Sequence, residues 1–295
     1  MRTRTFSAIL LLCVGFPATR AQYGSVNAKA VSAARAMTLL VVLDDGDSPY
    51  NRAITEAVKA HWTFSGNPEF IHAHDLAVAP LMPDKTYLLK TTLENPDHQP
   101  MTFVTVMQGW KQKKGEVLEG TNAGFKNIPG DQVLASIQCD PEVLAAQQAT
   151  AMYAVYVKHL QDYLKNVESG KIIDKATADR LYQGRNRLLR DQMKLWIAKD
   201  HLDRSLPDAE AVKANYTHEV QVLDRARIME AVSNQDHEVA VTDLILTGDN
   251  KNKHCYKRVF NAGTGELMYL RDDAALFGKK EGFIDEDFKQ VDRAR

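Results

Sequence analysis

The chain has 295 residues, of which 44% are hydrophobic and 25% are charged, a composition typical of globular proteins. Its 37 lysines and arginines nearly balance 38 aspartates and glutamates, giving a formal net charge of −1. This balance provides no general attraction to nucleic acid or to an anionic membrane surface, so no nucleic-acid partner is expected. The length permits one large domain or two smaller ones.

Residues 1–21 have the pattern of a secretory signal peptide. Two arginines precede an apolar run, Phe6–Phe16, and the small residue Ala21 ends the segment. The apolar run is shorter than the roughly 20 residues that a membrane-spanning helix needs. We therefore predict cleavage after Ala21 and a periplasmic or secreted protein without a later transmembrane segment. The alternative is a buried N-terminal helix.

An internal similarity organises the rest of the chain. The pentapeptide Glu-Ala-Val-Lys-Ala occurs at 56–60 and again at 210–214. Each copy follows an apolar segment that ends in aspartate, 38–45 in one case and 194–200 in the other. Branched and aromatic residues predominate in both segments, which predicts buried strands. Each unit is expected to run strand, helix, strand, short helix, strand and then a hairpin.

The predicted fold is therefore α/β, with two related strand–helix–strand–strand units and a helical segment between them. Alternating strands and helices indicate sheets with helices packed on them. We expect a linker at 22–37, the first unit at 38–140, a helical connector at 141–193 and the second unit at 194–272. A charged C-terminal tail, 273–295, is expected to fray.

The connector carries apolar residues at helical spacing. One face would contain Tyr153, Val157, Leu160, Leu164 and Val167. A second helix is expected from Thr177 to Gln192. We expect these faces to pack against the sheets.

Three segments, 195–200, 216–222 and the hairpin 255–270, resemble uncharacterised exported bacterial proteins. In those proteins a strand–helix–strand unit is duplicated around a helical middle. The resemblance implies the same organisation over most of the chain after the signal peptide, and it implies no activity or functional residues. A looser resemblance links the units to small α/β domains of envelope-assembly proteins, by analogy of fold alone.

The segment 72–75 is a candidate metal site. Residues two apart in an extended chain point to the same side, so His72 and His74 can face one cation, with Asp75 supplying a carboxylate. The corresponding segment of the second unit, 224–227, has no histidine. That difference favours the alternative of a surface segment before a short helix.

Three carboxylates, Asp44, Asp45 and Asp47, form an acidic loop after the first predicted strand. Ligand sites in open α/β sheets favour the carboxyl ends of strands, and carboxylates suit a hard cation. The alternative is a helix cap, because Asp47 or Ser48 can cap a helix that begins at Pro49.

Two cysteines, Cys139 and Cys255, remain after the predicted cleavage. A pair in an oxidising compartment can form a disulfide, although two separately buried thiols are the alternative.

No nucleophile elbow or phosphate-binding glycine loop is present, so no catalytic residue and no cofactor is predicted. We expect an exported non-catalytic module that binds a protein partner or a surface ligand. The alternative is an exported metal-assisted hydrolase that uses His72, His74 and Asp75, or the Asp44–Asp47 loop.

Overall fold

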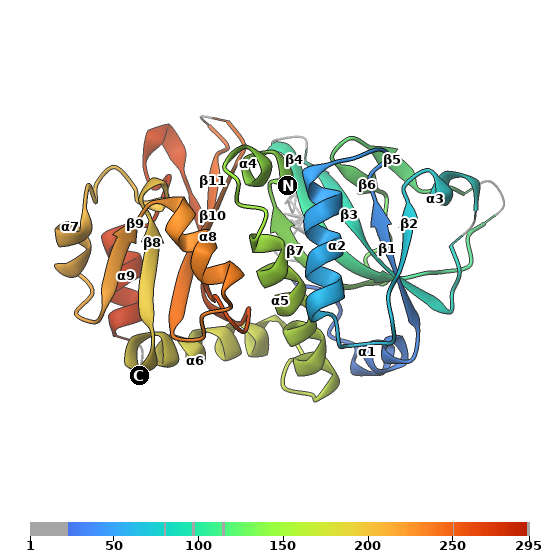
Figure 1. Cartoon of the computed structure of the whole chain (residues 1–295), viewed down its shortest axis with the longest axis horizontal. Helices are drawn as coiled ribbons and strands as arrows, with labels where there is room; N and C mark the ends of the chain where they lie inside the picture. The colour runs from blue at the N-terminus through green and yellow to red at the C-terminus, as the bar shows by residue number, and fades with distance from the viewer. Residues whose placement is uncertain (1–22, 80, 96–97, 114–115, 250, 294–295) are drawn as a thin grey trace, which may run out of the picture.

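The computed structural model describes residues 23–79, 81–95, 98–113, 116–249 and 251–293, so the predicted signal peptide lies outside the described ranges. Two lobes, each built on a mixed sheet, lie side by side with helices packed between and around them (Figure 1). The predicted α/β fold is confirmed. Within the described ranges, no helix is both long enough and apolar enough to cross a membrane.

The first lobe contains a seven-stranded sheet with the main order β2-β1-β3-β4-β7. The strand β1 pairs in parallel with β2 and β3, whereas β3, β4 and β7 pair antiparallel. The elements of this lobe are α1 (Ala28–Arg35), β1 (Thr38–Leu43), α2 (Pro49–His61), β2 (Glu69–His72), α3 (Asp75–Val78), β3 (Lys85–Asn95), β4 (His98–Gln108), β5 (Glu119–Thr121), β6 (Gly124–Lys126) and β7 (Val133–Cys139).

The second lobe repeats this connectivity in a five-stranded sheet with the order β12-β11-β10-β8-β9. Here β8 pairs in parallel with β9 and β10, and β10, β11 and β12 pair antiparallel. The elements are β8 (Lys194–Ala198), η2 (Lys199–His201), α7 (Ala209–Lys213), β9 (Val220–Leu223), α8 (Arg225–Ser233), β10 (Val239–Thr247), β11 (His254–Asn261), β12 (Leu267–Ala274), η3 (Leu276–Gly278) and α9 (Asp285–Asp292).

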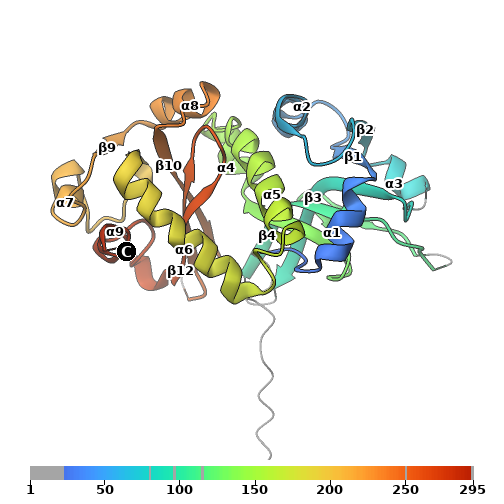
Figure 2. The ribbon, with the colours of Figure 1, turned by 90° about the horizontal axis from the view of Figure 1, so that it is seen from below.

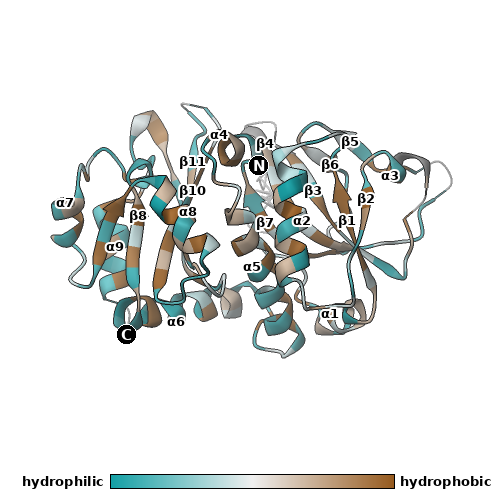
Figure 3. Ribbon diagram, in the orientation of Figure 1, coloured by the Kyte–Doolittle hydropathy of each residue, from teal (hydrophilic) through white to brown (hydrophobic). Residues whose placement is uncertain are grey.

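The connector forms α4 (Pro141–Ala146), α5 (Met152–Glu168) and α6 (Lys175–Gln192). The helix α5 lies between the lobes, and its residues share one hydrophobic core with Val104 and Ile137 of the first sheet and with Val241 and Phe260 of the second. Apolar residues accordingly concentrate on α5 and on the strands (Figure 3). The predicted apolar face of α5 is buried, but burial extends around the helix because both lobes pack on it.

The helix α6 begins at a capping box formed by Asp174 and Thr177, and it crosses the second lobe beside β12 (Figure 2). It thus starts slightly before the expected Thr177 and ends at the expected Gln192.

Two boundary predictions are wrong. The predicted linker 22–37 contains α1, which Asn27 caps and which buries Val31 and Ala34 in the core next to α5. The predicted fraying tail 273–295 contains α9, which buries Phe288 and Val291 in the second lobe. The high charge of 273–295 predicted a fraying tail, but many of these charged side chains form ion pairs within the second lobe.

Candidate functional site

The acidic loop and the histidine segment meet at the carboxyl ends of β1 and β2. The Asp45 carboxylate lies 2.7 Å from Nδ1 of His74, and this hydrogen bond lowers the pKa of Asp45 and raises that of His74. The Asp75 carboxylate accepts a hydrogen bond of 2.8 Å from the backbone N–H of His72 and lies 3.5 Å from Nε2 of His74. Two segments that the sequence singled out separately therefore form one exposed cluster.

The remaining carboxylates of the loop turn away from this cluster. Asp44 pairs with Lys90 at 2.7 Å, and Asp47 pairs with Arg52 at 2.6 Å. Ser48 caps α2 by accepting from the N–H of Asn51, as the capping alternative predicts. Among the described residues, no three or more histidines, cysteines or acids are grouped in a way that can hold a metal ion.

The second lobe carries a pair at the corresponding place. Asp45 and Asp200 lie two residues beyond the ends of β1 and β8, and His74 and Arg225 lie two residues beyond the ends of the neighbouring edge strands β2 and β9. The Asp200 carboxylate is 2.6 Å from the Arg225 guanidinium. Since Arg225 is not a metal ligand, the repeated geometry favours ion pairs that tie adjacent loops together.

The two cysteines are free and buried. Cys139 ends β7 in the first lobe and Cys255 lies on β11 in the second. Burial raises the pKa of each thiol to about 12, so neither is an activated nucleophile. Of the two arrangements left open by the sequence, the structure has two separate thiols and no disulfide between Cys139 and Cys255.

A cavity of about 260 Å³ opens between α6 and β12. We call it the α6–β12 pocket. Tyr23 and Gln290 lie at its rim, and β12 contributes Tyr269–Asp272. The face of α6 that lines it follows helical spacing and consists of Lys175, Asp179, Tyr182, Gln183 and Asn186.

A second, smaller cavity of about 20 Å³ also has Leu270 in its lining. Its walls include Gln138 of β7, His159 of α5 and Arg258 of β11. The volume holds about one water molecule. Arg258 joins the lobes here, because its guanidinium pairs with Asp243 and also donates to the backbone carbonyl of Gln138 at 2.9 Å.

Four buried polar atoms around these two cavities have no hydrogen-bond partner among the described residues. They are the Tyr182 hydroxyl, Asn186 Oδ1, Gln138 Nε2 and His159 Nδ1. A buried polar atom without a partner costs about 1–3 kcal/mol, so water or a ligand that supplies partners to these atoms would stabilise this region. Burial also lowers the pKa of His159 to about 4 and raises that of Tyr182, which keeps both side chains neutral at pH 7.

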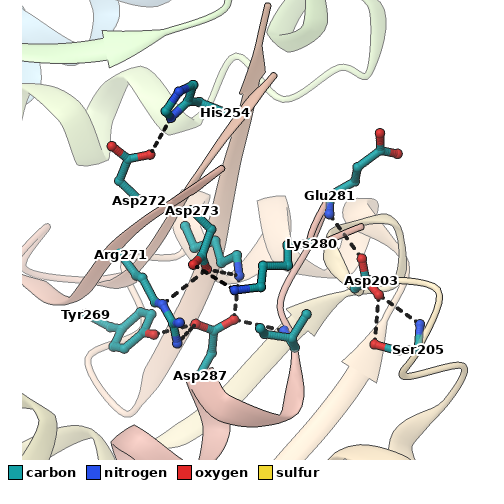
Figure 4. Close-up of polar contacts among 12 residues, drawn as sticks. Asp203, Ser205, His254, Tyr269, Arg271, Asp272, Asp273, Lys280, Glu281 and Asp287 are labelled. Atoms are coloured by element: carbon teal, nitrogen blue, oxygen red, sulfur yellow. Dashed lines mark hydrogen bonds and ion pairs between the residues drawn. The ribbon is translucent and has the colours of Figure 1, made fainter. Parts of the chain in front are cut away.

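The charged groups of the α6–β12 pocket, in contrast, are paired within the protein. Asp179 accepts a hydrogen bond of 2.6 Å from the Tyr23 hydroxyl and pairs with Lys175. Arg271 lies 3.1 Å from both Asp273 and Asp287, and Asp272 lies 3.2 Å from His254 (Figure 4). The pocket is therefore suited to hydrogen bonding with neutral groups.

Sequence reasoning missed this pocket, although one signal was present. It placed α6 in the core because of its leucines, whereas Lys175, Asp179, Gln183 and Asn186 form a polar stripe along the helix.

The chain was compared with protein-family models, with curated proteins and with solved structures, and none of these comparisons found a match.

Proposed function

We propose that this chain is an exported, non-catalytic module that binds a small polar ligand in the α6–β12 pocket. One observation carries the proposal: Tyr182 and Asn186, each with an unpartnered polar atom, line this pocket, and Gln138 and His159, which also have one each, line the adjoining small cavity. A concave site with a few convergent polar groups is the usual form of a small-molecule site.

The position of the pocket also supports a binding role. It is lined by Tyr23, α6, β12 and α9, and it shares Leu270 with the small cavity that β7, α5 and β11 line. A ligand there contacts segments that are far apart in the chain. The ionisable groups of the lining pair with one another, which supports recognition more than activation of a nucleophile.

Export is part of the proposal and is supported by the basic start, the apolar run Phe6–Phe16 and the small residue Ala21. Determining the N-terminus of protein purified from an exporting host tests this part. A chain that begins at Gln22 supports export, whereas a chain that retains the apolar run contradicts it.

Binding is tested by a thermal-shift screen of a metabolite library. A ligand present at about 100 times its Kd stabilises the native state by about 2.7 kcal/mol, which gives a clear increase in Tm. A library in which no compound stabilises the protein contradicts the proposal.

The variant Asn186→Leu tests whether a ligand found in this screen binds in the α6–β12 pocket. Because Asn186 Oδ1 has no partner, replacing it with an apolar group of similar shape is expected to leave the free protein as stable or more stable, while binding is lost. The matched control is Asn166→Leu on α5. Its buried amide donates to the Asp162 carbonyl at 2.7 Å, so this variant is expected to lose stability and keep binding.

A further inference from the structure

We propose that the ligand of the α6–β12 pocket is a neutral, polyhydroxylated molecule, a sugar or a related polyol. This inference rests on the proposed function and specifies the chemistry that the pocket recognises.

The first argument is the pairing of charges. Lys175 is 2.5 Å from Asp179, and Arg271 is held between Asp273 and Asp287. A charged ligand must compete with these internal partners for each contact. A zwitterion such as an amino acid faces this competition at both of its ends, whereas a neutral ligand does not.

The second argument is the kind of polar group that remains. Gln183 and Gln290 present side-chain amides at the exposed rim, and Asn186 presents a third at the buried end. Each amide offers both donors and an acceptor, and the Tyr182 hydroxyl does both as well. A ligand hydroxyl also does both, so it can donate to one of the exposed amides, Gln183 or Gln290, and accept from the other.

The third argument is the aromatic wall. The ring of Tyr23 stacks on Tyr182 with centroids 6.0 Å apart and planes 16° apart, and on Tyr163 at 6.2 Å and 11°. Tyr23 and Tyr182 are in the lining of the pocket and Tyr163 is not, so two of these rings add aromatic surface beside the hydrogen-bonding groups. A sugar ring has the matching combination, with apolar C–H groups on its faces and hydroxyls around its edge. A volume of about 260 Å³ suits a ligand of one or two rings.

The test is calorimetric titration of the purified chain with two sets of probes. The neutral set is glucose, galactose, N-acetylglucosamine, trehalose and glycerol. The charged set is glutamate, arginine and glucose 6-phosphate. We expect at least one neutral probe to bind, with a Kd that changes less than about twofold between about 50 mM and about 500 mM NaCl, because screening affects only charged partners.

The variant Gln183→Leu removes one rim amide and is expected to weaken binding of that neutral probe about five- to tenfold, the usual effect of losing one neutral hydrogen bond. The control Gln192→Leu lies on the same helix, is also exposed and is outside the lining, so it is expected to leave the Kd unchanged.

The outcomes separate this inference from the proposed function. If only charged probes bind, with affinity that falls in high salt and is lost in Asn186→Leu, the ligand class is overturned while the binding function stands. If Gln183→Leu and Gln192→Leu affect a neutral probe equally, the probe binds elsewhere and the inference is overturned. If no probe of either set binds and the metabolite screen is also empty, both proposals fail.

Discussion

Replacing Asp287 with alanine is expected to lower the free energy of unfolding by about 3–5 kcal/mol, since breaking a buried charge network leaves its other members without partners. Asp287 is 1% exposed and lies at the start of α9. Its carboxylate accepts from Lys257 at 2.8 Å, from the Tyr269 hydroxyl at 2.6 Å and from the backbone N–H of Ile284 at 2.8 Å (Figure 4).

The magnitude follows from what the substitution leaves behind. Lys257 is fully buried and keeps only one of its two carboxylate contacts, the one to Asp273 at 2.7 Å. The Tyr269 hydroxyl and the Ile284 N–H each lose an acceptor, at about 1–3 kcal/mol for each buried group. These losses together reach the range expected for a broken buried ion pair.

Urea unfolding followed by circular dichroism measures the effect. The control is Glu286→Ala, the exposed acid next in the helix, which is expected to change stability by less than about 0.5 kcal/mol. If Asp287→Ala is too unstable to purify, Asp287→Asn retains an acceptor and is expected to lose less. A loss below about 1 kcal/mol for Asp287→Ala, or one equal to that of Glu286→Ala, refutes the reasoning that this network anchors α9.

Three further predictions concern other parts of the molecule. Gly265→Ala is expected to destabilise the protein by more than about 1 kcal/mol, because Gly265 has φ of +70° and an added Cβ would lie 2.4 Å from Lys158 Cβ. Gly184→Ala on α6 meets no atom within 4 Å and is expected to stabilise the protein by about 0.5–1 kcal/mol. A higher Tm for Gly265→Ala than for Gly184→Ala contradicts this. Burial lowers the pKa of His159 and of His201 to about 4, below the value of about 6.5 for an unfolded histidine. Between about pH 6.5 and about pH 4 the unfolded chain therefore binds more protons than the folded chain, and the free energy of unfolding is expected to fall as the pH drops through this window. Urea midpoints across this window check it, and a slope that His159→Gln does not reduce counts against a buried neutral His159. Native protein is expected to resist iodoacetamide at both Cys139 and Cys255 and to react at both after unfolding, because their pKa values of about 12 keep the thiols protonated; a thiol that reacts quickly in the native state contradicts the burial.

Local patterns were sufficient to predict most of the elements. The apolar run from Thr38 and the one from Lys194 became the central strands β1 and β8, and the stripe from Tyr153 became α5. These predictions succeed because periodicity and propensity act within a few residues. They fail at α9, because the charged segment is held by contacts distant in sequence: Asp287 pairs with Lys257, and Phe288 and Val291 are buried in the second lobe.

The candidate sites likewise differ in whether the sequence predicted them. The sequence indicated Asp45 and His74, and the structure brings them together because both follow parallel neighbouring strands. It did not indicate the α6–β12 pocket, whose lining comes from Tyr23, α6, β12 and α9. No short motif can encode such a site, because its shape depends on how α6 packs beside the edge strand β12.

A difference between the two lobes explains where the small cavity of about 20 Å³ lies. Lys90 faces Val104 across β3 and β4, and at the corresponding place in the second lobe Asp243 faces Arg258 across β10 and β11. Lys90 is satisfied within its own lobe by Asp44, whereas Arg258 reaches across to the carbonyl of Gln138. The second lobe thus places a paired cation at the boundary where the first places an apolar side chain. Gln138 of the first lobe and His159 of α5 line the small cavity beside that cation, so both lobes contribute to this cavity, whereas the α6–β12 pocket is lined by Tyr23, α6, β12 and α9.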